Sequence, residues 1–190
     1  MIGVPVVMDG DTTPNRAVVL SRGHAYGIDA AALKCKFEQH SGLQHLLLRY
    51  TLALITQISQ TSVSTRHHVI EQQFCRWLLQ CLELVPGNQV MMTQELVATV
   101  LGVRREGITD VASRLRNAGI LNYVRGRITI LDRARLEACS CECYAEIKRE
   151  YERLLPASGR PEAGTRLMPG YAARRAPGSR AHRTPIQATR

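Results

Sequence analysis

Three consecutive residues, Arg104, Arg105 and Glu106, place two guanidinium groups and a carboxylate side by side. Arg105 has the planar fork that pairs with O6 and N7 of guanine, and Glu106 can accept the N4 hydrogen of cytosine. Arg104 is better suited to a backbone phosphate. A solvated helix end would also explain these residues, so the flanking sequence must decide between the two interpretations.

Other polar residues nearby extend the same chemistry. Arg125 and Arg127 flank Gly126, and we expect them to contact phosphates, with exposed turn residues as the alternative. Thr93 can cap a helix or donate to a phosphate. Thr109 and Asp110 fall on the polar side of the helix that Arg104 opens, although an aspartate facing DNA is repelled by phosphate unless it reads cytosine.

A second group of residues raises the question of metal or redox chemistry. The thiols are Cys139, Cys141 and Cys143, and an imidazole pair is formed by His67 and His68. On one helix Cys139 and Cys143 would share a face and Cys141 would point away, which is poor geometry for one ion. We therefore predict structural thiols, no metal site and no cofactor. The sequence also lacks a catalytic motif, which predicts that the protein is not an enzyme.

The secondary-structure elements predicted around the arginines would hold their side chains in a fixed orientation. Thr93 is a good N-cap for a first helix, and Gly102 provides a tight corner before a second helix over 104–117. Two strand-like runs follow at 121–124 and 128–131, joined by the basic turn Arg125-Gly126-Arg127. The inner face of the second helix consists of Ile108, Val111, Ala112 and Leu115. A hairpin with a basic tip directly after a helix-turn-helix is the winged helix-turn-helix pattern.

Two further helices are predicted upstream. Residues 41–62 carry an a/d spacing, which favours a dimer helix over an ordinary core helix. The positions of this seam are Gln44, Leu47, Thr51, Leu54, Ile58 and Thr61. Ser64 or Thr65 would cap a helix over about 66–84, with an apolar stripe formed by Ile70, Phe74, Trp77, Cys81 and Leu84 and with Arg76 on another face.

The two ends of the chain differ from this helical centre. At the start, VPVVM and RAVVL are short β-branched runs separated by turn residues, which predicts strands. From Pro156 onward the chain has seven arginines and one acidic residue, Glu162, which gives this segment a net charge of 7 − 1 = +6. The whole chain carries +9, so the first 155 residues carry only +3. Because large apolar residues are scarce there, we predict a disordered basic tail over 156–190.

The composition limits the classes of partner. A net charge of +9 and a sequence pI near 9.7 favour an anionic partner, nucleic acid before an acidic membrane. The longest apolar runs are far shorter than the ~18 residues of a membrane span, so no membrane partner is expected. Six cysteines without a signal peptide at the start of the chain indicate a reducing, cytoplasmic location.

The central sequence resembles the C-terminal half of the Crp/Fnr superfamily of bacterial transcription regulators, from about Leu43 to Leu155. The resemblance is most specific in MTQELVATVLGVRREGITDVASRLRNAGIL, the YVRGRITILDR wing and the CECY and EYERLL segments of the terminal helix. It implies that the recognition helix enters the major groove with an Arg-Glu pair, which matches Arg105 and Glu106. Arg104, Gly107 and Asp110 depart from residues common in the family, so its operator sequence should not be carried over.

The resemblance also implies an organisation for the whole chain. The fold is expected to be mainly α with a small β wing: 1–33 a remnant of a β-roll sensor domain, 34–64 a dimerisation helix region, 65–155 a winged helix-turn-helix domain and 156–190 the tail. Arg16-Ala17 remains of the family's cyclic-nucleotide motif, but the other residues of the motif are missing, so no cyclic nucleotide is expected.

The function that follows is sequence-specific regulation of transcription by a homodimer. Its partners are double-stranded DNA, a second copy through 41–62 and, as a further candidate, RNA polymerase. The alternative is a shortened homologue that dimerises with full-length relatives and modulates them without a DNA site of its own.

Overall fold

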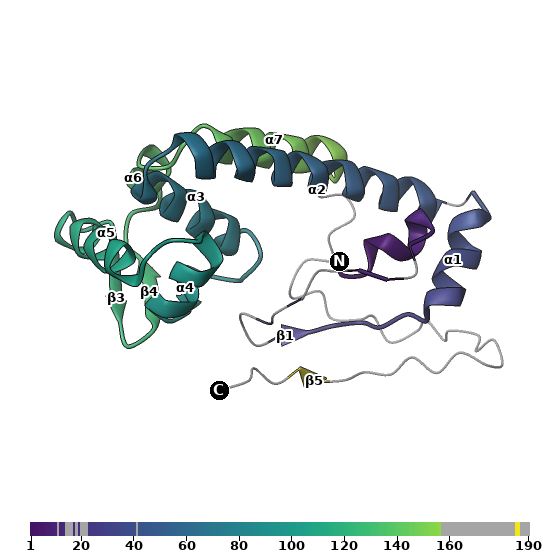
Figure 1. The fold of residues 1–190 in the computed structure, drawn as a ribbon, viewed down its shortest axis with the longest axis horizontal. Helices are drawn as coiled ribbons and strands as arrows, with labels where there is room; N and C mark the ends of the chain where they lie inside the picture. The colour runs from purple at the N-terminus through teal and green to yellow at the C-terminus, as the bar shows by residue number, and fades with distance from the viewer. Residues whose placement is uncertain are drawn as a thin grey trace, which may run out of the picture. The chain divides into compact units, whose positions relative to one another are not determined.

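The computed structural model describes residues 1–10, 12–13, 17, 19, 23–40, 42–156 and 185–186. The chain divides into two compact units, one with residues 1–51 and 151–190 and the other with residues 52–150. Figure 1 gives the order of the elements, and each unit is described by itself. No helix among the described residues is both long enough and apolar enough to cross a lipid bilayer.

The first unit contains short elements and the start of a long helix. Val4–Met8 forms a 3₁₀ helix, β1 is Gly23–His24, α1 is Ala30–Glu38 and α2 begins at Gly42. The prediction that VPVVM is a strand is wrong, because Pro5 sits in the first turn of the 3₁₀ helix and Gly10 donates back to the Pro5 carbonyl at 2.8 Å.

Two other expectations for the ends of the chain have different outcomes. The RAVVL run and Arg16 lie largely outside the described residues. Within the predicted tail, Pro185–Ile186 forms β5 and pairs antiparallel with β1, which the sequence did not indicate. The rest of the tail after Pro156 lies outside the described residues, so its predicted disorder stays a prediction.

Helix α2 spans Gly42–His67, five residues beyond its predicted end. The residues of the predicted a/d seam do not share one environment in the single chain, because Leu47 is buried whereas Ile58 is 60% exposed. The exposed apolar side chains of α2 within the second unit are Leu52, Ile55, Ile58 and Val63. These residues form a solvent-facing apolar side of the helix.

Helix α3 is Ile70–Leu82, shorter than predicted. Ser64 and Thr65 lie inside α2, so neither caps α3; the Gln72 side chain instead accepts the Val69 N–H at 3.3 Å. Phe74 and Trp77 belong to the core as predicted. Arg76 lies on another face than this stripe, but that face is also buried, because the residue is only 2% exposed.

The remaining elements complete a winged helix-turn-helix, as predicted. They are β2 (Gln89–Met91), α4 (Gln94–Leu101), α5 (Arg105–Asn117), β3 (Leu121–Val124) and β4 (Arg127–Ile130). The sheet order is β2-β4-β3 and all pairs are antiparallel. Strand β2 was not predicted. Its residues alternate exposed, buried and exposed in the structure, but the sequence does not show this alternation because the exposed Met91 is apolar.

Helices α6 (Arg133–Ala138) and α7 (Cys143–Leu154) follow the wing. Cys139 is the C-cap of α6, Cys141 lies in the turn, and Cys143 begins α7. The assumption that these three cysteines share one helix is therefore wrong. Two helices meet at this point, and the turn between them changes which thiols can approach each other.

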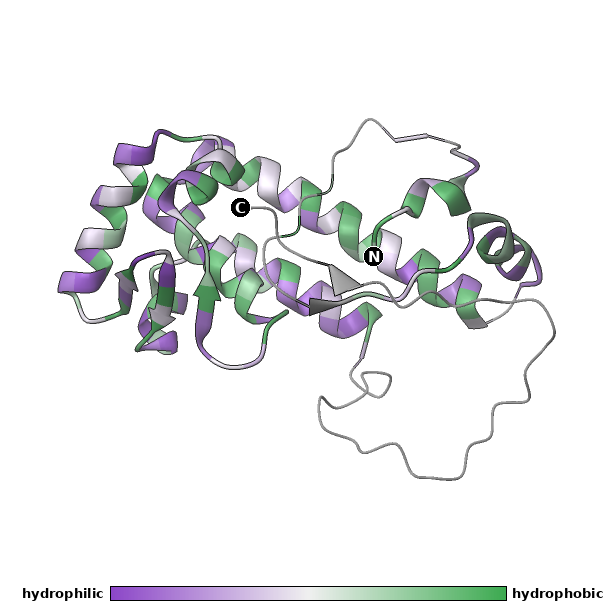
Figure 2. Ribbon diagram, turned by 90° about the horizontal axis from the view of Figure 1, so that it is seen from below, coloured by the Kyte–Doolittle hydropathy of each residue, from purple (hydrophilic) through white to green (hydrophobic). Residues whose placement is uncertain are grey.

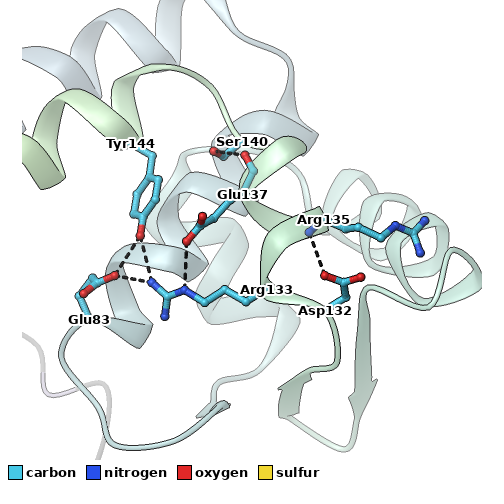
Figure 3. A network of polar contacts seen from close by, with 7 residues as sticks. All are labelled: Glu83, Asp132, Arg133, Arg135, Glu137, Ser140 and Tyr144. Carbon is cyan, nitrogen blue, oxygen red and sulfur yellow. Dashed lines mark hydrogen bonds and ion pairs between the residues drawn. The ribbon is translucent and has the colours of Figure 1, made fainter.

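A polar network joins the end of α3 to α6 and α7 (Figure 3). The Arg133 guanidinium donates to Glu83, to Glu137 at 3.0 Å and to the Tyr144 hydroxyl at 3.1 Å, and that hydroxyl donates to Glu83 at 2.9 Å. Partial burial would raise the pKa of Glu83, but the hydrogen bonds from Tyr144 and Arg133 outweigh it and lower that pKa. Burial and the nearby Glu83 raise the pKa of Tyr144 to about 12.

Candidate nucleic-acid interface

Helix α5 is amphipathic, and its inner face fixes how the polar face is presented. Ile108, Val111, Ala112 and Leu115 are each at most 4% exposed, as their spacing predicted. In Figure 2, α5 is the helix at the left edge and carries both hydrophilic and hydrophobic bands. Because the apolar face is committed to the core, Arg105, Glu106, Thr109 and Asp110 remain exposed on the other side.

The corner before α5 follows the predicted helix-turn-helix chemistry. Thr93 caps α4 by accepting the Leu96 N–H at 3.2 Å, as expected. Gly102 ends α4 with a φ of 67°, a left-handed conformation that glycine adopts without strain. Arg104 occupies the N-cap of α5 but makes no side-chain cap hydrogen bond, so its guanidinium stays available to solvent.

The charged groups at the start of α5 have no internal partner. Among the described residues, no side-chain hydrogen bond or ion pair involves Arg104, Arg105, Glu106 or Asp110. Arg114, one of the later arginines of α5, differs, since it forms a 2.9 Å ion pair with Glu71 of α3. The charged side chains in the first turn of α5 therefore point to solvent, whereas Arg114, later in the helix, forms an ion pair within the domain.

Thr109 has a different position from its charged neighbours. Its hydroxyl lies 3.0 Å from Oε1 of Gln94 and 3.1 Å from the Arg105 carbonyl oxygen. The contact with Gln94 ties the outer face of α5 to the first residue of α4. Gln94 was missing from the sequence-based site, because only the tertiary contact between α4 and α5 gives it this position.

The wing tip is a tight turn with an arginine at its strained position. Arg125 and Gly126 have φ values of 49° and 76°, and the strands on either side pair Val124 with Arg127. Positive φ at both central residues is what a two-residue type I′ hairpin turn requires. Arg125 and Arg127 are both exposed, one within this turn and the other at the start of β4.

The wing is fastened to the start of α4. Met92 N–H donates to the Gly126 carbonyl at 2.7 Å, and the Tyr123 hydroxyl donates to the Met92 carbonyl at 2.8 Å. Burial raises the pKa of Tyr123 to about 12, so this hydroxyl keeps its donor hydrogen at neutral pH. The residues around the start of α4 thus contact both α5, through Gln94, and the wing tip, through Met92.

Gly107 has a structural explanation inside the domain. A Cβ at this position would lie 3.2 Å from Cδ1 of Ile70, which is tighter than an ordinary van der Waals contact. The glycine therefore lets α5 approach α3 closely, at a helix-propensity cost of about 1 kcal/mol relative to alanine. A side chain at this position would require Ile70 to shift by a few tenths of an ångström, so the close packing of α5 on α3 favours glycine here.

Comparison with known proteins bears on this surface. Residues 72–139 match the model of the Crp-like helix-turn-helix domain, a span that includes α4, α5 and the wing. The match confirms, for this domain, the family predicted from the sequence. A helix-turn-helix is a DNA-binding module and not a catalytic one, in agreement with the predicted class. No curated protein sequence matches the chain significantly.

Several solved structures are similar to this chain over part of their length, among them the following three. A protein from Eubacterium rectale described as a Crp/Fnr-family transcriptional regulator has 26% identity and a TM-score of 0.43, covering 59% of this chain and 52% of that one. A CRP-family transcriptional regulator from Thermus thermophilus has 21% identity and a TM-score of 0.42, covering 48% and 50%. The catabolite activator protein of the same species has 18% identity and a TM-score of 0.34, covering 62% and 48%. The match spans about half the length of each of these proteins.

Proposed function

Because residues 72–139 form a Crp-like helix-turn-helix domain, we propose that this chain is a sequence-specific DNA-binding regulator of transcription that acts as a homodimer. The observation that supports this most directly is the exposed Arg105-Glu106 pair, without internal partners among the described residues, in the first turn of α5. A cytoplasmic location follows from this role, as does contact with RNA polymerase, and both stay predictions.

Within this proposal each residue has a role that its chemistry and exposure support. Arg105 reads guanine through O6 and N7, and Glu106 accepts from cytosine N4. Arg104, Arg125 and Arg127 bind backbone phosphates and fix the register of the domain on the duplex. Their contribution weakens with salt, because each neutralised phosphate releases counterions.

The other three predicted residues, Thr93, Thr109 and Asp110, have supporting roles at the proposed DNA interface. Thr109 supports α5 from within, because its one hydroxyl hydrogen has two acceptors in reach, the Gln94 Oε1 and the Arg105 carbonyl oxygen. Thr93 acts mainly as the α4 cap. Asp110 is exposed and uncompensated, so it disfavours phosphate close to the second turn of α5 and selects a groove position where a cytosine can donate to it.

The proposed dimer uses the exposed apolar side of α2. Leu52, Ile55, Ile58 and Val63 are 44–60% exposed in the single chain, and a second copy of the same helix would cover them. A two-fold dimer places two recognition helices about 34 Å apart, one turn of B-DNA, so the site is expected to be an inverted repeat.

The test is selection of bound duplexes from a random pool at moderate salt, with the oligomeric state measured by sedimentation. Enrichment of an inverted repeat by a folded dimer is the expected result. A folded dimer that enriches no sequence would contradict specific DNA binding. Heterodimers with longer relatives, in the absence of independent enrichment, would favour the modulator alternative.

A pair of matched variants tests the dimer surface. Ile55→Glu with Ile58→Glu should shift the protein toward monomer, because two carboxylates would have to be desolvated at the interface. Gln60→Glu adds a carboxylate to the same helix at a half-buried position on a different side from Ile55 and Ile58, and should perturb the dimer much less. If neither variant shifts the protein toward monomer, the Ile55–Ile58 side of α2 is not the interface.

A further inference from the structure

Three side chains of metal-binding type converge where the α2–α3 connection meets the turn between α6 and α7. One ring nitrogen of His68 and the Sγ atoms of Cys141 and Cys143 all lie within 4.8 Å of one another. His68 belongs to the two-residue connection between α2 and α3, Cys141 to the turn between α6 and α7, and Cys143 to the first position of α7. The cluster brings together segments more than 70 residues apart in the sequence.

The cluster has the burial and spacing of a soft-metal site. Cys141 and Cys143 are 3% and 1% exposed, and the His68 side chain is 14% exposed. The Cys143 sulfur lies 3.7 Å from Nε2 of His68. Around a tetrahedral Zn²⁺, with bonds of about 2.3 Å to sulfur and 2.0–2.1 Å to nitrogen, ligand atoms sit roughly 3.5–3.8 Å apart. The side chains therefore need only small movements to meet one ion.

A buried cation next to the cluster is the second observation. Arg76 is 2% exposed, and its guanidinium donates to neutral oxygens: Ser64 at 3.1 Å, Thr61 at 3.3 Å and Gln80 at 2.6 Å. Among the described residues no carboxylate pairs with it. Ser64 is fully buried and its oxygen lies 3.4 Å from the Cys141 sulfur. Since Ser64 accepts from Arg76, its own hydrogen is free to point at that sulfur.

A negatively charged metal–thiolate centre would balance the positive charge of Arg76. A buried guanidinium without a negative partner is costly, because its hydration is lost without compensation. Two thiolates and a further carboxylate around Zn²⁺ carry a net charge of −1. The hydroxyl of Ser64 would connect this charge to Arg76. The hydrogen bonds and the ion would then form one neutral unit inside the domain.

Glu142 can supply the fourth ligand. Its Oε1 lies 3.3 Å from Nε2 of His68, and its side chain is 73% exposed. The carboxylate therefore lies on the solvent side of the cluster, and a rotation of this exposed side chain does not disturb the core. Cys139 belongs to a different position, the C-cap of α6, and is not one of the clustered residues.

We propose that His68, Cys141 and Cys143 bind a thiophilic d¹⁰ cation, with Glu142 as the fourth ligand when the ion is Zn²⁺. The ion would link the α2–α3 connection to the α6–α7 turn. Two residues after His68, Ile70 packs against Gly107 of α5, so the ion fixes the segment that precedes this contact. The metal site does not depend on the proposed DNA binding and is tested without DNA.

The experiment uses the full chain, purified anaerobically, stripped with a chelator and titrated with Co²⁺ as a spectroscopic stand-in for Zn²⁺. We expect a thiolate-to-cobalt charge-transfer band that saturates at one equivalent and disappears when Zn²⁺ is added. Cys141→Ser, Cys143→Ser and His68→Asn should each weaken binding by more than about tenfold, the lower limit seen for outer-sphere partners of metal sites.

Cys139→Ser is the matched control, because it removes a neighbouring thiol that lies outside the cluster. It should keep the band and the affinity, and circular dichroism of every variant checks that the domain is folded. Glu142→Gln should weaken Zn²⁺ but leave Cu⁺ unchanged, because Cu⁺ is satisfied by the three clustered ligands; equal retention of both ions would remove Glu142 from the site. No band in the folded wild-type protein, or equal loss in Cys139→Ser, would overturn the proposal.

Discussion

Arginines in two regions of the second unit are used in opposite ways. At the first turn of α5 and on the wing, Arg104, Arg105, Arg125 and Arg127 are exposed, and their guanidinium groups have no carboxylate partner among the described residues. On the α3–α6–α7 side, Arg133 is held by two glutamates and a tyrosine. The same type of side chain is therefore left available to an external polyanion in one region and serves the fold in the other.

The contrast has a physical reason. Internal partners restrict Arg133, and the hydrogen bonds that it makes contribute to folding. A guanidinium that must bind phosphate or a base cannot be neutralised internally without losing its function. Charges without partners on an otherwise satisfied domain are thus a useful indicator of a binding surface, and mutations should perturb the two regions separately.

The largest effect is expected for Arg105→Ala. Affinity for the selected DNA site should fall about tenfold to a hundredfold, since one bidentate contact to a base contributes about 1–3 kcal/mol. Stability should not change, because Arg105 has no internal side-chain partner among the described residues. The measurement is a binding titration on the selected duplex together with urea denaturation.

The control for this variant is Arg116→Ala, which removes an exposed arginine from the last turn of the same helix. It should leave base preference unchanged. If both variants weaken binding equally and across all sequences, Arg105 acts as a general positive charge and does not read a base.

A smaller effect, on stability alone, is expected for Arg133→Ala. Loss of its hydrogen bonds to partly exposed glutamates should lower the free energy of unfolding by roughly 1–2 kcal/mol, after allowance for solvent screening. Arg149→Ala is the control, because its ion pair is with the exposed Glu146 three residues earlier, and it should cost less than about 0.5 kcal/mol. DNA affinity of the folded variants should stay at the wild-type value.

The same network predicts a pH dependence. The folded state lowers the pKa of Glu83 below its ordinary value of 4.5, so the unfolded chain binds a proton first as the pH falls. The stabilisation from Glu83 is complete above that ordinary value and is lost as the pH drops through the lowered pKa. In acid titrations of stability, Glu83→Gln should flatten this part of the curve, and an unchanged curve would mean that Glu83 is not coupled to folding.

The smallest effect is expected for Arg125→Asn. Asparagine tolerates the positive φ of this position better than arginine, so stability should be unchanged or rise by a few tenths of a kcal/mol. The slope of log affinity against log salt should decrease by about 0.9, the value for one phosphate contact. Arg127→Asn gives the same charge loss at a strand position, and a slope unaffected by both variants would remove the wing from the interface.

Sequence patterns determined much of the winged helix-turn-helix without any structure. The inner face of α5, the Gly102 corner and the basic hairpin tip each depend on local rules of periodicity and turn chemistry. These rules act between residues close in the chain, so they can be read directly. The departure at Gly107 was visible too, but its cause was not, because the atom it accommodates belongs to Ile70, 37 residues earlier.

Only the tertiary structure decided which distant polar residues meet. The sequence placed Arg76 off the apolar stripe of its helix, without showing that it is buried, and it suggested that the cysteines were on one helix. In the structure the α6–α7 turn and the α2–α3 connection place two thiols beside His68, and Arg76 is buried nearby. Helical periodicity predicts on which face of its own helix a residue lies, but it does not predict which residues of another element pack against that face. The sequence by itself therefore determined the helix-turn-helix type of domain, and the fold determined which charges are exposed and which are enclosed.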